Sequence, residues 1–182
     1  MPKNILAFGA SNSSKSINKR LAKWASSQIE NVEVNLIDLN DFEMAIYSMD
    51  REENSGIPDK AKRFRELINS SDGLLISFAE HNGGFSTAFK NVFDWASRLG
   101  KDLWDNKPTM LMATSPGKRG GMSVLNSAVS RFNFMGAGEI ISFSLPLFNN
   151  NFNDQNGIIN QELLSLFNDQ CRAFEKLLSA KS

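Results

Sequence analysis

The sequence predicts an α/β fold in which helices cover both faces of a parallel β-sheet. Short apolar runs alternate with longer amphipathic stretches along the chain. The apolar runs are continuous and do not alternate with polar residues, which is typical of strands buried on both faces of a sheet. Five strand–helix units fit within 182 residues, so we expect one doubly wound domain of three layers over residues 1–182.

Five apolar runs have the length of strands and are expected to form the sheet. They span residues 4–8, 32–37, 73–78, 109–114 and 139–143. The longer stretches that follow them place apolar residues at helical spacing. These predicted helices span residues 17–29, 58–69, 87–99, 122–134 and 161–178. Residues 149–157 are rich in Asn, Asp and Gly, which predicts a surface loop.

The balance of charges argues against two classes of partner. Lys and Arg together number 20, as do Asp and Glu, so no basic excess indicates nucleic acid or an anionic membrane. No apolar run approaches the roughly 20 residues that span a bilayer, and no signal peptide opens the chain. We therefore expect a cytoplasmic protein with no nucleic-acid or membrane partner.

The cysteine and histidine content limits the possible chemistry. The single cysteine, Cys171, cannot form an intramolecular disulfide and is compatible with a reducing compartment. It lies among apolar residues at helical spacing, so we expect a buried structural thiol and not a reactive one. With one cysteine and one histidine, the chain has too few of these ligands for a Cys/His metal site.

Three loops of unusual composition follow the first, third and fourth predicted strands. In open α/β sheets, ligands bind outside the carboxyl ends of the strands. The first loop, residues 9–17, offers the hydroxyl groups of Ser11, Ser13 and Ser16 just before a helix. It lacks both the G-x-G-x-x-G fingerprint and the Gly-Lys-Ser/Thr ending of a Walker A loop. It therefore fits a terminal phosphate monoester, and the alternative is an ordinary loop with a serine N-cap.

The second loop, residues 79–85, contains two adjacent glycines that permit close approach of a flat ligand. Asn82 offers both a donor and an acceptor. His81 is the only histidine, but no nucleophile motif accompanies it, so a positional or solvent-facing role is favoured over catalysis. In the helix that follows, the simplest interpretation of Trp95 is a core aromatic residue.

The third loop, residues 115–121, is rich in glycine and precedes another predicted helix. Its backbone amides suit a carbonyl-bearing ring edge, and Lys118 or Arg119 suits an anionic cosubstrate. The alternative interpretation is a solvated turn. The convergence of three such loops at one sheet edge favours a single ligand site.

Four segments resemble the flavodoxin-like NADPH-dependent FMN reductases, a family that includes quinone, azo-dye and chromate reductases. Residues 10–22 resemble the family pattern Gly-Ser-x-Arg-x-x-Ser-x-Asn-x-x-Leu-Ala. Residues 79–83 resemble Pro-Glu-Tyr-Asn-Gly, and residues 89–95 resemble Leu-Lys-Asn-x-x-Asp-Trp. Residues 115–121 match the pattern Ser-x-Gly-x-x-Gly-Gly. The resemblance covers the chain up to about Pro146.

The resemblance implies a flavodoxin-like parallel sheet of five strands in the order 2-1-3-4-5. It also implies an oxidoreductase that passes reducing equivalents from NADPH or NADH, through bound FMN, to quinones, azo compounds, free flavin or similar small acceptors. Carried over by position, the residues implied to hold the FMN phosphate are Ser11, Ser13, Ser16, Ile17 and Asn18. Those implied to border the ring are Glu80, His81, Asn82 and Gly83 on one edge, and Ser115, Gly117, Gly120 and Gly121 on the other. No catalytic side chain is implied, because the flavin N5 carries the chemistry.

Three positions depart from the family pattern. Ser13 replaces an arginine, which removes a cation near the phosphate. Ala79 replaces a proline, which loosens the second loop, and His81 replaces a tyrosine, which alters the surface beside the flavin and the substrates accepted.

Two other functions remain open at this point. A flavodoxin-type electron carrier would be strongly acidic and would have a Thr-x-Thr-Gly-x-Thr phosphate loop, whereas this chain has zero net charge and no such loop. A flavin-free signalling or assembly domain that kept the fold is the third possibility. The absorption spectrum of the purified protein, with and without added FMN, distinguishes that domain from the two flavoproteins.

The predicted helix over residues 87–99 carries Phe89, Val92, Phe93 and Trp95 around most of its circumference. A helix that covers one sheet face needs only one apolar stripe. The surplus aromatic surface predicts a subunit interface beside the flavin, in a homodimer or homotetramer, as the family resemblance also implies. The alternative is that these aromatic residues all belong to the core.

Overall fold

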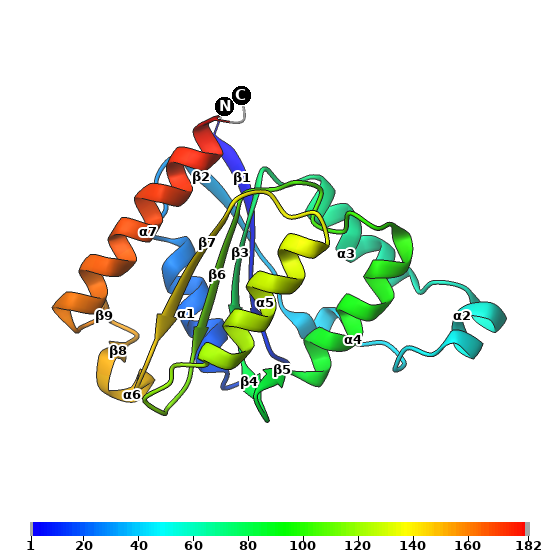
Figure 1. Cartoon of the computed structure of the whole chain (residues 1–182), viewed down its shortest axis with the longest axis horizontal. Helices are drawn as coiled ribbons and strands as arrows, with labels where there is room; N and C mark the ends of the chain where they lie inside the picture. The colour runs from blue at the N-terminus through cyan, green and yellow to red at the C-terminus, as the bar shows by residue number, and fades with distance from the viewer. Residues whose placement is uncertain (1, 181–182) are drawn as a thin grey trace.

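A five-stranded parallel sheet forms the centre of the protein, whose computed structural model describes residues 2–180 (Figure 1). The strands are β1 (Lys3–Ala10), β2 (Val32–Leu36), β3 (Gly73–Phe78), β6 (Thr109–Thr114) and β7 (Ile140–Leu145). They are arranged in the order β2-β1-β3-β6-β7, and every neighbouring pair is parallel. Numbered within this sheet alone, the order is 2-1-3-4-5, so the predicted flavodoxin-like topology is confirmed.

Helices cover both faces of the sheet, as the continuous apolar strands predicted (Figure 1). On one face lie α1 (Ile17–Ser26) and α7 (Gln161–Ala180). On the other face lie α3 (Asp59–Asn69), α4 (Thr87–Ala96) and α5 (Met122–Phe134). Every residue of β3 and β6 is buried, because both strands lie in the interior of the sheet between the two helical layers.

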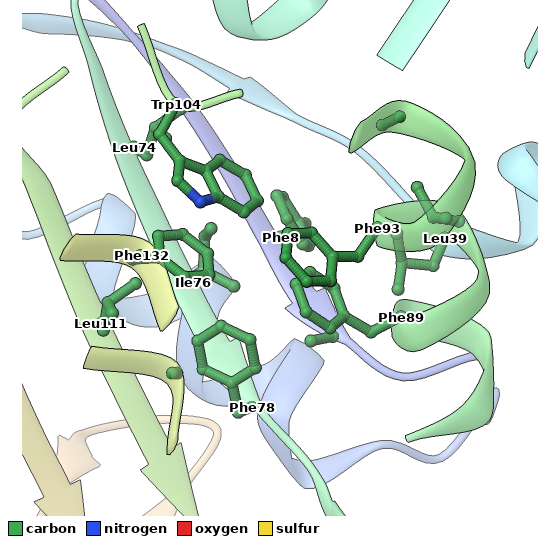
Figure 2. Packing of buried hydrophobic residues seen from close by; sticks show 14 of the residues in the cluster. Phe8, Leu39, Leu74, Ile76, Phe78, Phe89, Phe93, Trp104, Leu111 and Phe132 are labelled. Carbon is green, nitrogen blue, oxygen red and sulfur yellow. The ribbon is translucent and has the colours of Figure 1, made fainter. Parts of the chain in front are cut away.

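The core beneath α4 and α5 is rich in aromatic rings (Figure 2). Phe89 and Phe93 of α4 stack with centroids 5.9 Å apart, and Trp104 stacks on Phe132 at 3.8 Å. The four apolar residues of α4 used above to predict a subunit interface are at most 7% exposed. The predicted surplus of aromatic surface on this helix is therefore wrong. Residues 44–47 cover the side of the helix that carries Trp95. The aromatic residues on all sides of α4 are therefore buried by contacts within one chain.

Several short elements lie outside the predicted pattern. After β2 come a 3-10 helix, η1 (Leu39–Phe42), and α2 (Met49–Ser55), which projects from the body of the fold (Figure 1). The predicted helix over residues 87–99 changes after α4 to a second 3-10 helix, η2 (Ser97–Leu99). A hairpin of β4 (Glu80–His81) and β5 (Gly84–Phe85) follows β3.

The predicted surface loop at residues 149–157 is partly wrong. The segment forms α6 (Phe148–Asn151) and a hairpin of β8 (Phe152–Asn153) and β9 (Gly157–Ile158). Phe152 is buried and packs edge-on against Trp24 of α1, so this hairpin belongs to the core beneath α1 and α7. Asn and Asp at its turn gave the segment the composition of a loop, whereas long-range aromatic contacts decided its burial.

Cys171 is buried on α7, as predicted. Burial raises the pKa of its thiol to about 12, so little of the reactive thiolate exists at neutral pH. Within residues 2–180, no helix is long and apolar enough to cross a membrane.

Candidate functional site

The three loops singled out in the sequence all lie at the carboxyl edge of the sheet. They follow β1, β3 and β6, which are adjacent strands. The predicted site residues lie on these loops or in the first turn of α1, so the topology brings them to one edge of the fold (Figure 1). What each residue does there is set by its hydrogen bonds.

The serine hydroxyls of the first loop organise the backbone at the start of α1. Ser16 is the N-cap, and its Oγ accepts a hydrogen bond from the Lys19 N–H at 3.2 Å. Ser11 Oγ accepts from the Ser13 N–H at 3.2 Å, and Ser13 Oγ accepts from the Lys15 N–H at 3.3 Å. Because all three hydroxyls act as acceptors in these bonds, their O–H groups remain available to donate to a ligand.

Several backbone donors of this loop are also free. The N–H groups of Asn12, Ser14, Ile17 and Asn18 make no hydrogen bond to any acceptor within residues 2–180. Two of them belong to the first turn of α1, where the helix dipole presents its positive end. The loop therefore has the donors that an anion such as phosphate requires.

The side chain of Asn18 does not join these donors. Its Nδ2 donates to the Thr114 carbonyl, and its Oδ1 accepts from the Thr114 N–H, both at 3.1 Å. The same Oδ1 accepts from Ser77 Oγ at 2.7 Å. Asn18 is buried and links α1 to the ends of β3 and β6, so it can reach a bound phosphate only through its backbone N–H.

The second loop is a β-hairpin that presents an exposed histidine. Asn82 and Gly83 both have positive φ, +52° and +78°, which is the conformation of a two-residue type I′ turn. The Asn-Gly dipeptide is a strong signal for this turn, and the sequence interpretation above missed it. The turn leaves the His81 side chain exposed beside the first loop.

Glu80 connects the second loop to the helix that follows the third loop. Its Oε2 accepts a hydrogen bond from the Val124 N–H at 3.0 Å, in the first turn of α5. The carboxylate therefore satisfies one of the free N–H groups at the positive end of that helix. This contact assigns the Glu80 side chain a positioning role in addition to the border position that the resemblance implies.

Two further hydrogen bonds complete the connections at this edge. Ser86, the N-cap of α4, donates from its Oγ to the Ala10 carbonyl at 2.8 Å and so ties the second loop to the first. In the third loop, the Gly120 carbonyl accepts from Ser144 Oγ at 3.0 Å. Together with the Asn18 and Glu80 contacts, these bonds connect the three loops through residues at their ends or in the helices and strands that adjoin them.

A charged pair flanks the first loop. Lys19 donates to Asp38, the N-cap of η1, just after β2. Partial burial alone would raise the pKa of Asp38, but the hydrogen bonds from Lys19 and from the Asn40 N–H lower it below its ordinary value. Lys118 and Arg119 are exposed on the third loop, and the Arg119 guanidinium donates to Ser123 Oγ at 2.9 Å.

The structure adds a segment that the sequence interpretation did not assign to the site. We call residues 43–55, between η1 and the end of α2, the strap. Asn91 Oδ1 accepts from the Tyr47 N–H at 2.9 Å, while Asn91 Nδ2 donates to the carbonyls of Met44 and Ala45. Trp95 Nε1 donates to the Ala45 carbonyl at 2.8 Å, and Arg98 pairs with Glu52. The signal was present in residues 89–95, where Asn and Trp stand four apart on one helix face.

Within the part of the chain that is described, no group of three or more His, Cys, Asp or Glu side chains is placed to hold a metal ion.

Comparison with known proteins finds a matching family model and several similar sequences. The family model described as NADPH-dependent FMN reductase matches residues 3–149. A 2-hydroxy-1,4-benzoquinone reductase from a Burkholderia species is 36% identical over 107 residues, which cover 58% of this chain and 56% of the relative. A quinone reductase from Pseudomonas putida is 33% identical over 117 residues, 63% of this chain and 61% of the relative. The aligned segments thus span little more than half the length of these relatives.

Solved structures with the same fold include FerB, a flavoenzyme NAD(P)H:(acceptor) oxidoreductase from Paracoccus denitrificans. It superposes with a TM-score of 0.77 over 98% of both chains, at 21% sequence identity. An azoreductase from Bacillus anthracis superposes with a TM-score of 0.62 over 97% of this chain and 98% of its own, at 14% identity. At these identities the likeness establishes the fold.

Proposed function

Since this chain belongs to the NADPH-dependent FMN reductase family, we propose that it binds FMN across the three loops and transfers reducing equivalents from NADPH or NADH to a small-molecule acceptor. The observation that carries the proposal is the set of hydrogen bonds that connects the three loops and the elements adjoining them at one sheet edge. A cofactor that spans all three loops needs them to be held in one arrangement before it binds. The names of the quinone reductase relatives support the same activity.

The residues of the three loops suit FMN. Four free backbone N–H groups and three serine O–H groups in the first loop suit a phosphate dianion, and no arginine is needed to hold it. We propose that Ser11, Ser13 and Ser16 donate through side chains, and that Ile17 and Asn18 donate through backbone N–H groups. The β4–β5 hairpin and the third loop, with Gly117, Gly120 and Gly121, would border the ring.

Bound FMN would supply the redox chemistry, by accepting a hydride from the nicotinamide and passing two electrons to the acceptor. The protein would bind and orient the FMN and polarise its ring. Glu80 fixes the hairpin against α5, and Asn18 fixes α1 against β3 and β6, so the donors around the ring keep their positions during turnover.

FMN should bind at least about a hundredfold more tightly than riboflavin, because only FMN carries the phosphate that the first loop would hold. Replacing Ser16 by alanine should cost about 1–2 kcal/mol of FMN binding energy and leave riboflavin affinity unchanged. Titration by flavin fluorescence measures both constants. Ser127→Ala, on the exposed face of α5, is the control. Equal affinities for FMN and riboflavin would contradict the phosphate role of this loop.

NADPH or NADH should reduce the bound FMN, and a quinone or azo compound should reoxidise it. Because both substrates would visit the same flavin in turn, initial-rate plots should be parallel lines. Stopped-flow absorption records the reduction directly. If the flavin stays oxidised for minutes in excess NADPH and NADH, the reductase function fails and the electron-carrier alternative is favoured.

We also propose that the protein works in the cytoplasm, as a homodimer or homotetramer of this single domain. The buried lone cysteine supports a reducing compartment. With the α4 aromatics buried, the support for association is the exposed apolar surface of the strap at Ile46 and Met49. Light scattering at micromolar concentration should give at least twice the chain mass of 20.3 kDa. A monomeric particle with full reductase activity would contradict the proposed oligomeric state.

A further inference from the structure

The donors that the first loop offers to a phosphate are all neutral, since they are backbone N–H groups and serine O–H groups. A phosphate monoester carries about two negative charges at neutral pH. Neutral donors can bind such a group, but a cation beside it adds a charge-assisted hydrogen bond, which is roughly twice as strong. Two cationic side chains, Lys19 and Arg20, follow closely after Ser16, the N-cap of α1.

Of these two cations, Arg20 is the one available to the first loop. The Lys19 ammonium group is already paired with Asp38. Arg20 follows Ser16 by one helical turn, so the two residues share one face of α1. Side chains of a helix lean toward its N-terminus, so the Arg20 side chain covers the turn that begins at the loop.

The Arg20 guanidinium is held by three neighbours that leave its outer donors free. Its Nε donates to Asp154 Oδ1 at 2.7 Å. Its central carbon lies 4.9 Å from the centroid of the Phe148 ring and 5.8 Å from that of Phe152. Within residues 2–180, Nη1 and Nη2 make no hydrogen bond. The guanidinium therefore has a restricted orientation and unused N–H groups.

The ring that lies nearer to Arg20 belongs to a segment bonded to the third loop. Phe148 is the first residue of α6, and its N–H donates to the Ser115 carbonyl at 3.1 Å. The Leu147 N–H donates to the Gly117 carbonyl at 3.0 Å. As a result, α6 lies at the same end of the sheet as the β4–β5 hairpin (Figure 1). Arg20 is thus connected to the first loop through α1 and to the third loop through Phe148.

We propose that Arg20 binds the phosphate of FMN through Nη1 or Nη2, while its Nε stays bonded to Asp154. This inference rests on the proposed function. Because Asp154 and the two rings restrict the guanidinium before the ligand arrives, less side-chain entropy is lost on binding. The Asp154 carboxylate also offsets part of the positive charge, which limits the attraction for phosphate. The Arg20–Asp154 pair therefore sets how strongly the protein prefers FMN to riboflavin.

Titration of the flavin-free full chain with FMN and with riboflavin, followed by flavin fluorescence, tests this assignment. Arg20→Met keeps a long side chain over the two rings but removes the charge and the donors. It should weaken FMN binding about tenfold and change riboflavin binding less than about twofold. Arg20→Lys keeps the charge without the planar guanidinium and should weaken FMN binding about threefold. Asp154→Asn still accepts from Nε but has no charge, so it should strengthen FMN binding about twofold.

Lys23→Met is the matched control, since Lys23 is exposed on α1 about one turn farther from the loop. It should change neither affinity by more than about 1.5-fold, because an exposed charge at that distance is largely screened. Equal weakening of FMN and riboflavin by Arg20→Met would mean that Arg20 only supports the fold and would overturn the inference. Equal effects of Arg20→Met and Lys23→Met would overturn it as well.

The same titration separates this inference from the proposed function. If the parent protein binds FMN and riboflavin equally, the phosphate role of the first loop fails and the assignment of Arg20 fails with it. If the parent protein prefers FMN and Arg20→Met keeps the whole preference, only the assignment of Arg20 fails.

Discussion

Replacing Asn18 by aspartate should lower the free energy of unfolding by about 3 kcal/mol at pH 7. The two side chains have nearly the same shape, so the change alters hydrogen bonding and charge while leaving the packing volume almost unchanged. A carboxylate can still accept from Ser77 and Thr114, but it cannot donate to the Thr114 carbonyl as the Asn18 amide does. The substitution thus leaves a buried carbonyl without its donor and places a charge in the interior.

The sign of the pH dependence provides a second check on Asn18→Asp. A protonated carboxyl group is neutral and can donate to Thr114, so the folded state favours the protonated form more than the unfolded chain does. The variant should therefore be closest to the parent protein at low pH and should lose stability as the pH rises and the new group ionises.

Urea unfolding of the parent and Asn18→Asp at several pH values measures both effects. Asn150→Asp, on an exposed side chain with no hydrogen bond of its own within residues 2–180, is the control and should cost little. An equal loss in the two variants would show that the Asn18 contacts do not stabilise the sheet edge.

Replacing Gly157 by alanine should lower the free energy of unfolding by about 3 kcal/mol, for two separate reasons. Gly157 has φ +71°, in the left-handed region that disfavours side chains. A Cβ at this position would also overlap the indole ring of Trp24. The indole has little freedom to move away, because it packs against both Phe152 and Phe167.

Gly83→Ala separates these two causes. Gly83 also has a positive φ, +78°, in the type I′ turn of the β4–β5 hairpin, but a Cβ there would meet nothing within 4 Å. This control should lose only about 1 kcal/mol, the cost of the backbone conformation alone. Urea unfolding measures both variants. Equal losses would mean that the contact between the β8–β9 hairpin and α1 contributes little to stability.

The sequence by itself determined the architecture and the positions of the three loops. Continuous apolar runs indicated strands buried on both faces, and β3 and β6 are buried at every residue, with the predicted bounds. This succeeded because periodicity and strand length are local properties of the chain. The loops could be placed together for a topological reason, since parallel strands end at a common edge where ligands bind. The motifs at residues 10–22 and 79–95 are sufficient by themselves to indicate the family.

Only the tertiary structure decided which side chains are available to a ligand and which stabilise the edge of the sheet. Asn18 was grouped with the phosphate residues, yet its amide bonds to Thr114, 96 positions away. The pattern of aromatic residues in α4 predicts an interface, but the strap covers Trp95 from a segment about 50 positions earlier. Composition marked residues 149–157 as a loop, whereas contacts with Trp24 bury part of it. In each case the residue that makes the decisive contact is distant in the sequence. Burial against such a residue does not depend on the local spacing of apolar residues, so the local sequence pattern could not predict it.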